Sequence, residues 1–296
     1  MLAENSYGKS GIRLVLRTRR GERDEIRDLT VAIALEGDFE AAHVDGDNSR
    51  VLPTDTMKNT VYALARSRGI GAIEEFGLLL ADHFLGASAA ASSVRVSISE
   101  RPWERLRQGS GQHPTAFVRP GAERRIARVE KGPAGVKVRS GLEDLTLLKS
   151  AGSGFSGFLR DSYTTLRETE DRILATAVQA LWTCASGEIS WQPLARAIRS
   201  TLLQTFADHE SASVQHTLNA MGEAVLSGHP EVADIRLSMP NKHHTLVDLS
   251  AFGLDNQGEV FVATEEPYGL IEATLVRRRE PSDQRERDGR GTPRST

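Results

Sequence analysis

The sequence predicts an α+β fold in which an antiparallel sheet with helices on one of its faces occurs twice in tandem. Two patterns predict it: stretches in which apolar and polar residues alternate, as in half-buried strands, and longer stretches with apolar residues at helical spacing. The third observation is their order, strands, then two helices, then strands, which the second half of the 296 residues repeats without visible sequence identity. We therefore expect domains at residues 1–140 and 141–278.

The first half contains two helical stretches between alternating ones. From Asp55, apolar residues recur at helical spacing, beginning with Met57 and Val61. A second such stretch is expected to end at Gly86, because glycine commonly follows the last turn of a helix. Helices are therefore predicted from Asp55 and over 73–85, and strands over 12–19, 29–35, 94–98 and 126–138.

The second half gives the same order of elements. Strands are predicted over 142–149 and 171–183, helices over 191–207 and 212–227, and further strands over 232–238, 244–249, 259–264 and 270–276. From Arg277 the chain is polar and charged, with almost no large apolar residue. Residues 279–296 are therefore expected to form a disordered tail.

Composition indicates a folded protein of a reducing compartment. The formal net charge of -3 gives no excess of positive charge, which argues against a nucleic-acid partner. Cys184 is the sole cysteine and cannot form an internal disulfide. No stretch approaches the ~20 apolar residues of a membrane span, and neither terminus carries a secretory or peroxisomal signal. We expect a cytoplasmic protein that binds neither nucleic acid nor membrane.

A glycine-rich segment, GSGFSG at residues 152–157, has the spacing of a dinucleotide-binding fingerprint. That fingerprint belongs in the first turn of a βαβ unit, where a helix N-terminus faces the pyrophosphate. Here it lies in mid-chain, and the FLRDSYTTLRE that follows lacks an amphipathic helical pattern. A glycine-rich loop is the better interpretation.

The segment PNKHH places His243 and His244 side by side before a predicted strand. Successive side chains of a strand point to opposite faces, so the two cannot readily hold one metal ion together. At most one of them serves a site. The plain alternative for either is a surface histidine that makes an ordinary hydrogen bond.

Two helix starts carry polar residues that suit helix capping. Thr54, Asp55 and Thr56 precede the first predicted helix, and SVQHTL from Ser213 begins the corresponding helix of the second half. Capping alone would explain them, although paired helix N-termini also suit an anionic ligand. Taken singly, Arg172 and Lys9 would be solvated surface charges, and no one of these motifs identifies a function.

Taken together, six segments resemble the urate oxidase family. They are YGKS, PTDTMKNTVYALA, GSGFSGFLRDSYTTLRETEDRIL, SVQHTL, PNKHH and EEPYGLI, in the order and spacing of the family. The likeness extends from about Tyr7 to Arg277. It implies a tunnelling fold with two similar domains per chain, in which paired subunits form barrels and two stacked barrels form a homotetramer around a channel.

The resemblance also implies which residues bind the substrate. Arg172 and Gln215 would hold the edge of a flat purine, because guanidinium supplies a planar fork of donors and the amide supplies a donor and an acceptor. Phe155 would stack on the face of the purine. The further contacts implied are Leu166 beside Phe155, the backbone amide of Val214, and Ile271 in the pocket wall.

Other matched residues would handle protons and oxygen. Thr54 and Asp55 resemble residues that a neighbouring subunit contributes, so that active sites would lie at subunit interfaces. Thr54, Lys9 and His243 resemble a relay that moves protons to and from a water or peroxide above the purine. Asn241 would help bind the oxygen species. As a base, Lys9 needs a neutral state, which partial burial favours.

The implied reaction converts urate, oxygen and water to 5-hydroxyisourate and hydrogen peroxide. Urate is an electron-rich anion and can supply the electrons that other oxidases take from a flavin or metal. The resemblance therefore implies no cofactor and no metal, with urate and molecular oxygen as partners. The protein would bind, deprotonate and orient urate and hold oxygen against it.

Two other functions agree with parts of the sequence. A tunnelling-fold cyclohydrolase or aldolase relative would anchor its heterocycle through a glutamate, and some such enzymes need zinc held by Cys and His; the matched anchors here are Arg172 and Gln215. A catalytically silent purine-binding or scaffold protein could dispense with Lys9, Thr54 and His243. All three are present.

Overall fold

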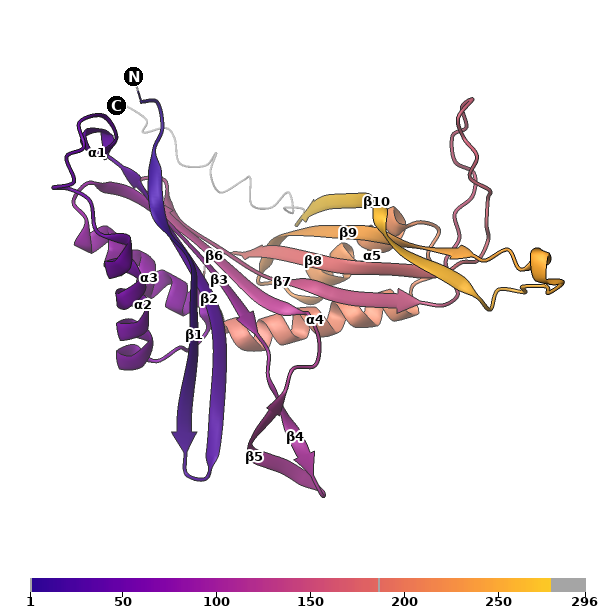
Figure 1. The fold of residues 1–296 in the computed structure, drawn as a ribbon, viewed down its shortest axis with the longest axis horizontal. Coiled ribbons are helices and arrows are strands. Elements are labelled where there is room, and N and C mark those ends of the chain that lie inside the picture. Colours follow the sequence, from indigo (N-terminus) through magenta and orange to yellow (C-terminus); the bar gives the residue numbers. More distant parts are fainter. Residues whose placement is uncertain (1, 186, 278–296) are drawn as a thin grey trace, which may run out of the picture.

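The computed structural model describes residues 2–185 and 187–277, within which eight strands form one antiparallel sheet in the order β1-β2-β3-β6-β7-β8-β9-β10 (Figure 1). The strands are β1 (Ser6–Arg20), β2 (Arg23–Gly37), β3 (Ala91–Arg101), β6 (Arg124–Gly132), β7 (Gly135–Lys149), β8 (Leu174–Cys184), β9 (Val232–Leu246) and β10 (Phe261–Val276). The helices are α1 (Glu40–Val44), α2 (Thr54–Arg68), α3 (Ile73–Ala87), α4 (Trp191–Asp208), α5 (Val214–Gly228) and the short 3-10 turn η1 (Ser250–Phe252). The tail expected over 279–296 lies outside the described residues.

The helices cover one face of the whole sheet. Residues directly opposite each other on neighbouring strands share a face, and one such row crosses every strand of the sheet. Its members are Ile12, Val31, Ile98, Ala127, Ser140, Trp182, Ile235 and Leu275. Seven of them are buried and Leu275 partly so. This confirms the predicted α+β class, with the difference that both halves share a single continuous sheet.

Two hydrophobic cores lie under this face. The first joins β1, β2, β3 and β6 to α2 and α3, with Met57, Leu80 and Phe84 among its fully buried members. The second joins β7, β8 and β9 to α4 and α5, with Trp182 and Ile198 at its centre. Each half therefore has a helix pair and a core of its own.

Strand β7 belongs to both halves. Its residues 135–143 pair with β6 and its residues 139–149 with β8, so the expected domain limit at 140/141 falls inside a strand. A bulge between Leu142 and Leu145, with Asp144 at φ 60°, inserts one extra residue. Because of it, Ser140 and Leu142 before the bulge and Leu145 after it all face the core.

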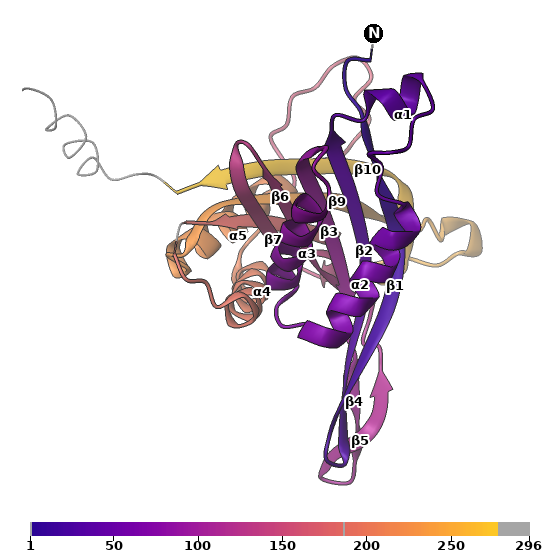
Figure 2. The ribbon, with the colours of Figure 1, turned by 90° about the vertical axis from the view of Figure 1, so that its left-hand side faces the viewer.

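Most predicted elements occur within a few residues of their expected limits. The single strand predicted over 126–138 is wrong, because a hairpin turn at Pro133 and Ala134 divides it into β6 and the start of β7, which continues through the predicted strand 142–149. The predicted pairs 232–238 with 244–249, and 259–264 with 270–276, are each one long strand, β9 and β10. The sequence did not predict α1, or the separate hairpin of β4 (Glu104–Gln108) and β5 (Gly111–Val118). This hairpin lies beside the β1–β2 hairpin (Figure 2), where Arg23 donates to Gln112 at 3.2 Å.

Among residues 2–185 and 187–277, the helices are all too short or too polar to cross a membrane.

The packing of α3 on the sheet gives a prediction with an internal control. A Cβ atom on buried Gly77 would lie 2.8 Å from Val129 Cγ2, whereas a Cβ on Gly86 of the same helix would meet nothing within 4 Å. Gly77→Ala should lower the free energy of unfolding by about 1–3 kcal/mol through overpacking. Gly86→Ala should raise it by about 0.5 kcal/mol, because alanine restricts the unfolded chain.

Thermal midpoints of both variants, measured at one protein concentration, check this difference. Equal midpoints for the two variants would show that α3 does not approach β6 as closely as described.

Candidate active site

Strand alternation brings three of the expected site residues to one end of the helix-covered face. Asn241 and His243 follow buried Met239 of β9 at intervals of two residues, and Asn241 lies directly opposite Thr176 of β8. Arg172 precedes buried Leu174 by the same interval. The pattern that buries the core therefore places these polar side chains where the core ends.

Residues 150–173 form a long loop that stands away from the body of the molecule between β7 and β8 (Figure 1). The Asp171 carboxylate holds the base of this loop, because its Oδ1 accepts hydrogen bonds from Gly152 N at 2.7 Å and Ser153 N at 3.3 Å. Phe155 and Thr169 exchange two backbone hydrogen bonds, of 2.7 and 3.1 Å. The two arms of the loop are therefore joined at its base.

The glycines of GSGFSG serve this loop geometry. A Cβ atom on Gly154 would lie 3.0 Å from the carbonyl oxygen of Glu170 and 3.2 Å from that of Thr169, so the two arms approach closely only because residue 154 lacks a side chain. Gly152 and Gly157 have positive φ angles of 72° and 67°. Strand β8 follows this segment, with no helix between them in this described part of the chain, which confirms the loop interpretation.

Arg172 and Phe155 form the centre of the candidate site. The guanidinium carbon of Arg172 lies 5.2 Å from the centroid of the Phe155 ring, and that ring stacks on Phe158 at 5.0 Å. Within the described residues, Arg172 Nε is buried without a hydrogen-bond partner. Burial lowers the pKa of the Arg172 guanidinium from its ordinary value, although arginine still carries its charge at neutral pH. A half-buried cation beside an aromatic face suits a flat anion.

A cavity of about 720 Å³ opens beside this pair. Its lining includes Phe155, Leu166, Arg172 and His243, so the structure brings four expected site residues together. The rest of the lining comes mainly from the end of β9 and the segment up to residue 256. Leu166 is 54% exposed, and its place on the cavity wall leaves room for a ligand against it.

The start of α5 lies beside the same loop. Ser211 N donates to Gly152 O at 3.0 Å, and Gly154 N donates to Ser211 O at 2.8 Å. Ser213 caps the helix, since its hydroxyl accepts from His216 N at 3.1 Å. The helix begins at Val214, whose side chain is buried, while the next residue, Gln215, is exposed. The first amides of α5 therefore open next to the Phe155 loop.

Asn241 and Ile271 come together across the β9–β10 pair. Ile271 lies opposite Met239, and Gly269 lies opposite Asn241. A Cβ built on Gly269 would touch both side chains, at 3.8 Å from Ile271 Cδ1 and 4.0 Å from Asn241 Cβ. Neither residue lines the cavity beside Arg172, so the structure brings these two together apart from the four that line it.

Lys9 on β1 and Thr54 and Asp55 at the start of α2 form a separate cluster, which we call the lysine cluster. Helix α2 lies at the opposite end of the molecule from the loop between β7 and β8 (Figure 1). Tyr7, two residues before Lys9 on β1, holds the segment that enters α2, because its hydroxyl accepts from Leu52 N at 2.9 Å. The pKa of Asp55 is lowered mainly by a hydrogen bond from Lys58 and by the charge of Lys58, with a smaller contribution from the charge of Lys9. Lys9 and Asp55 are therefore electrostatic neighbours.

Thr54 does not cap α2, which corrects the capping interpretation of this segment. Pro53 occupies the N-cap position, Thr54 is the first helical residue, and α2 has no side-chain cap. Asp55 is engaged by Lys58 and by Asn59, whose Nδ2 donates at 3.0 Å. The side chains of these residues do not accept hydrogen bonds from the first backbone N–H groups of α2. Capping therefore does not explain why they stand at the start of this helix.

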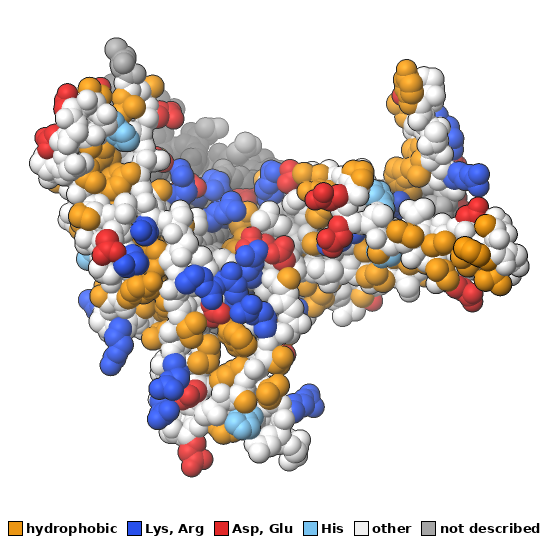
Figure 3. All heavy atoms as spheres, in the orientation of Figure 1, with side chains coloured by type: hydrophobic (Ala, Val, Ile, Leu, Met, Phe, Trp, Pro, Cys, Tyr) orange, Lys and Arg blue, Asp and Glu red, His pale blue; other side chains and the backbone are white. Residues whose placement is uncertain are grey.

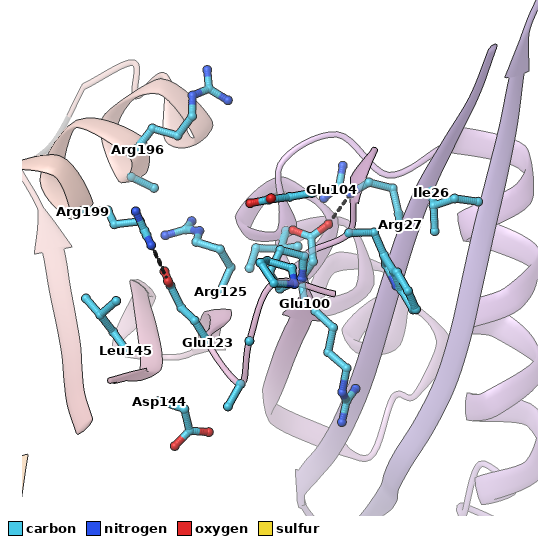
Figure 4. A pocket seen from close by; sticks show the side chains of 18 of the residues that line it. Ile26, Arg27, Glu100, Glu104, Glu123, Arg125, Asp144, Leu145, Arg196 and Arg199 are labelled. Carbon is cyan, nitrogen blue, oxygen red and sulfur yellow. Dashed lines mark hydrogen bonds and ion pairs between the residues drawn. The ribbon is translucent and has the colours of Figure 1, made fainter. Parts of the chain in front are cut away.

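A second cavity, of about 950 Å³, contains none of the expected site residues. It lies between the start of α3, the base of the β4–β5 hairpin and α4, and Figure 4 shows Arg199 reaching Glu123 across it. That pair forms two hydrogen bonds of 2.7 Å, and Arg125 pairs with buried Glu74 at 2.6 Å. Three of its six described lining arginines, Arg27, Arg125 and Arg199, pair with carboxylates of this chain, and the cavity lies at the junction between the two halves.

Sequence reasoning missed Asp171 and Ser211, which hold the loop. Their partners lie 19 and 59 residues away in the chain, at Gly152. Asp171 is one of several acidic residues around Arg172, and nothing in its spacing distinguishes it. The described residues contain no group of three or more His, Cys, Asp or Glu side chains arranged to hold a metal ion. Burial raises the pKa of the Cys184 thiol to about 11.

Comparison with known proteins gives one consistent result. A family model described as Uricase matches residues 5–130 and 138–272. The uricase of Arthrobacter globiformis is 47% identical over 277 residues, covering 94% of this chain and 90% of the relative, and that of Dictyostelium discoideum is 38% identical over 286 residues, covering 93% and 97%. The crystal structure of the Arthrobacter globiformis uricase superposes with a TM-score of 0.88, covering 96% of this chain and 99% of that one.

The role of Asp171 can be tested by hydrogen exchange. Asp171→Ala removes the acceptor for Gly152 N and Ser153 N, and a hydrogen bond to a charged group contributes about 1.5–3 kcal/mol. Exchange of the Gly154 and Phe155 amides should therefore accelerate by about tenfold or more. Asp161→Ala, at the exposed end of the loop, is the control and should leave those two amides unchanged. Equal effects of the two variants would contradict a clamp at Asp171.

Proposed function

The chain belongs to the uricase family, and from this premise we propose how its residues divide the work of oxidising urate. The protein is a urate oxidase, an oxidoreductase of purine degradation that acts on urate with oxygen. The single observation that supports the proposed binding mode is the half-buried Arg172 beside Phe155 in a cavity of about 720 Å³.

In the proposed complex, urate lies flat in this cavity. Its negative charge meets the guanidinium of Arg172, which replaces the water that burial has removed from that group. Phe155 stacks on the purine face, and Leu166 covers the neighbouring surface. Gln215 and the backbone amide of Val214 bind the remaining polar edge, while Ile271 closes the wall. Stacking and a planar fork of donors together select a flat, anionic heterocycle.

The reaction balances without a further reductant or oxidant. Urate gives two electrons to oxygen, which leaves as hydrogen peroxide, and the oxygen atom of one water remains on the oxidised purine as the hydroxyl of 5-hydroxyisourate. Two protons complete the peroxide. Because the substrate carries the electrons itself, the protein needs to orient urate and oxygen and to move protons between them.

We assign the proton transfers to Lys9, Thr54 and His243. A hydroxyl both donates and accepts, so Thr54 can pass a proton between the Lys9 amine and a water or peroxide above the purine. His243 lies on the cavity wall, and its ring nitrogens can donate to or accept from the opposite side of the same water. Asn241 offers an amide to the oxygen species from the end of β9.

The proposal requires two chains for each site. Within one chain the lysine cluster and the Arg172 cavity lie at opposite ends (Figure 1), and the described sheet ends in two long strands, β1 and β10, each paired on one side. Hydrophobic side chains gather at the right-hand end of the molecule (Figure 3). In the segment from the end of β9 through η1, Leu246, Phe252 and Leu254 are exposed. We propose a homotetramer in which Thr54 and Asp55 of the partner subunit complete each cavity.

An aerobic assay on chelator-treated protein tests the activity. Loss of the ultraviolet absorption of urate should be accompanied by equal molar oxygen uptake and peroxide release, as the balanced reaction requires. Arg172→Ala should chiefly abolish binding, whereas Lys9→Met should slow turnover far more than it weakens binding. Turnover that needs added flavin or metal, or equal losses of affinity in both variants, would count against the mechanism.

Sharing of the site between subunits gives a quantitative prediction. Thr54→Ala and Arg172→Ala should each be nearly inactive. When the two are co-expressed, a mixed pair contains one intact site and one doubly defective site. Random pairing should then restore about one quarter of wild-type activity.

The matched control is co-expression of Thr54→Ala with Lys9→Met, which both alter the lysine cluster. Each site of a mixed pair then has one defect, and no activity should return. Recovery in both mixtures, or in neither, would refute a site assembled from two chains in this way.

A further inference from the structure

Ser211 lies where two parts of the proposed site meet, the Phe155 loop and the start of α5. Its backbone exchanges hydrogen bonds with Gly152 and Gly154 of the Phe155 loop. Its hydroxyl is buried and makes two further contacts: it accepts from Thr217 Oγ1 at 2.7 Å and donates to Ser213 O at 3.0 Å. The same residue thus joins the substrate loop to the first turn of α5.

The Ser211 hydroxyl donates to the carbonyl oxygen of the Ser213–Val214 peptide group. The carbonyl of Ser213 and the N–H of Val214 belong to one planar amide, in which they point in opposite directions. Ser213 O also accepts from Thr217 N at 3.1 Å. With two donors fixed on its oxygen, this amide cannot rotate freely, and the direction of the Val214 N–H is set.

These hydrogen bonds form a chain in which every donor points the same way. Thr217 donates to Ser211, Ser211 donates to Ser213 O, and the amide of that peptide group offers its N–H beyond. In such a chain each donor polarises the next, and the effect is stronger in a buried, low-dielectric environment. Thr217 and Ser211 are both buried, so water competes little for these bonds.

We infer that Ser211 and Thr217 are positioning residues, which orient and polarise the Val214 amide so that it binds the anionic edge of urate. The inference rests on the proposed function, because it takes Val214 N–H as a substrate contact. Neither hydroxyl touches the substrate: Thr217 acts through Ser211, and Ser211 acts through the Ser213–Val214 peptide.

The test is the dissociation constant for urate, measured by titration without oxygen, together with KM and kcat in air. Ser211→Ala and Thr217→Val each break the donor chain, and loss of one buried hydrogen bond should weaken urate binding by about three- to tenfold. KM should rise by a similar factor, with kcat changed less, because the proton-transfer residues stay in place. The double variant should be little worse than either single one, since both act through one chain.

Two further variants separate positioning from packing. Thr217→Ser keeps the hydroxyl and loses the methyl group, so its affinity should stay within about twofold of wild type. Ser140→Ala is the matched control: Ser140 is another fully buried hydroxyl, which donates to Glu74 and accepts from Arg125 at 3.1 Å in the junction between the halves. It should lower the thermal midpoint and leave urate affinity unchanged.

Unchanged affinity in Ser211→Ala or Thr217→Val would overturn the inference, as would equal losses in Thr217→Ser and Thr217→Val. An equal loss in Ser140→Ala would also overturn it, because the effect would then be general. If Ser211→Ala does not fold, Ser211→Cys replaces it, since the thiol keeps the volume and is a weaker donor. Failure of wild-type protein to oxidise urate would instead refute the proposed function, so the two failures are distinguishable.

Discussion

One constraint governs this molecule: a single sheet of eight described strands has its four long helices, α2 to α5, on one face, and its two edge strands pair within the chain on one side only. The row of opposed residues from Ile12 to Leu275 is apolar apart from Ser140. The helices of the same chain cover this apolar face, so it needs no second chain. The edges, β1 and β10, still expose backbone donors and acceptors that favour pairing with another strand. The division of the candidate site follows from this, because its two clusters lie toward the two ends of the sheet.

The chemistry at the cavity depends on polar groups that the fold leaves poorly satisfied. Arg172 loses water on burial and gains an aromatic neighbour in place of a carboxylate. Such a group lowers stability in the empty protein, and in the proposed complex the urate anion would compensate it, so that part of the binding energy is prepared in advance. The loop can hold Arg172 in that state because Asp171 and Gly154 fix its base.

The sequence predicted the elements well where apolar residues follow a regular period, and less well where the site interrupts that period. Strand β9 was divided in two because PNKHH breaks its alternation, and β10 was divided because EEPYG does the same. These interruptions occur where the strands leave the core and enter the candidate site. The resemblance to urate oxidases supplied the site residues. Contacts such as Asp171 with Gly152 could not be foreseen, since loop closure over 19 residues leaves no periodic signal.

The bulge in β7 links the two halves in a way that bears on how such a chain can change during evolution. Core-facing positions switch from even to odd numbers between Leu142 and Leu145, so this one extra residue sets which way every later side chain of the strand faces. Loss of a residue here would turn Leu145 toward solvent and rotate the exit at Lys149 into the substrate loop. Insertions and deletions in homologues should therefore accumulate at hairpin tips. They should avoid this strand, even though a bulge looks like a place where a residue could be gained or lost.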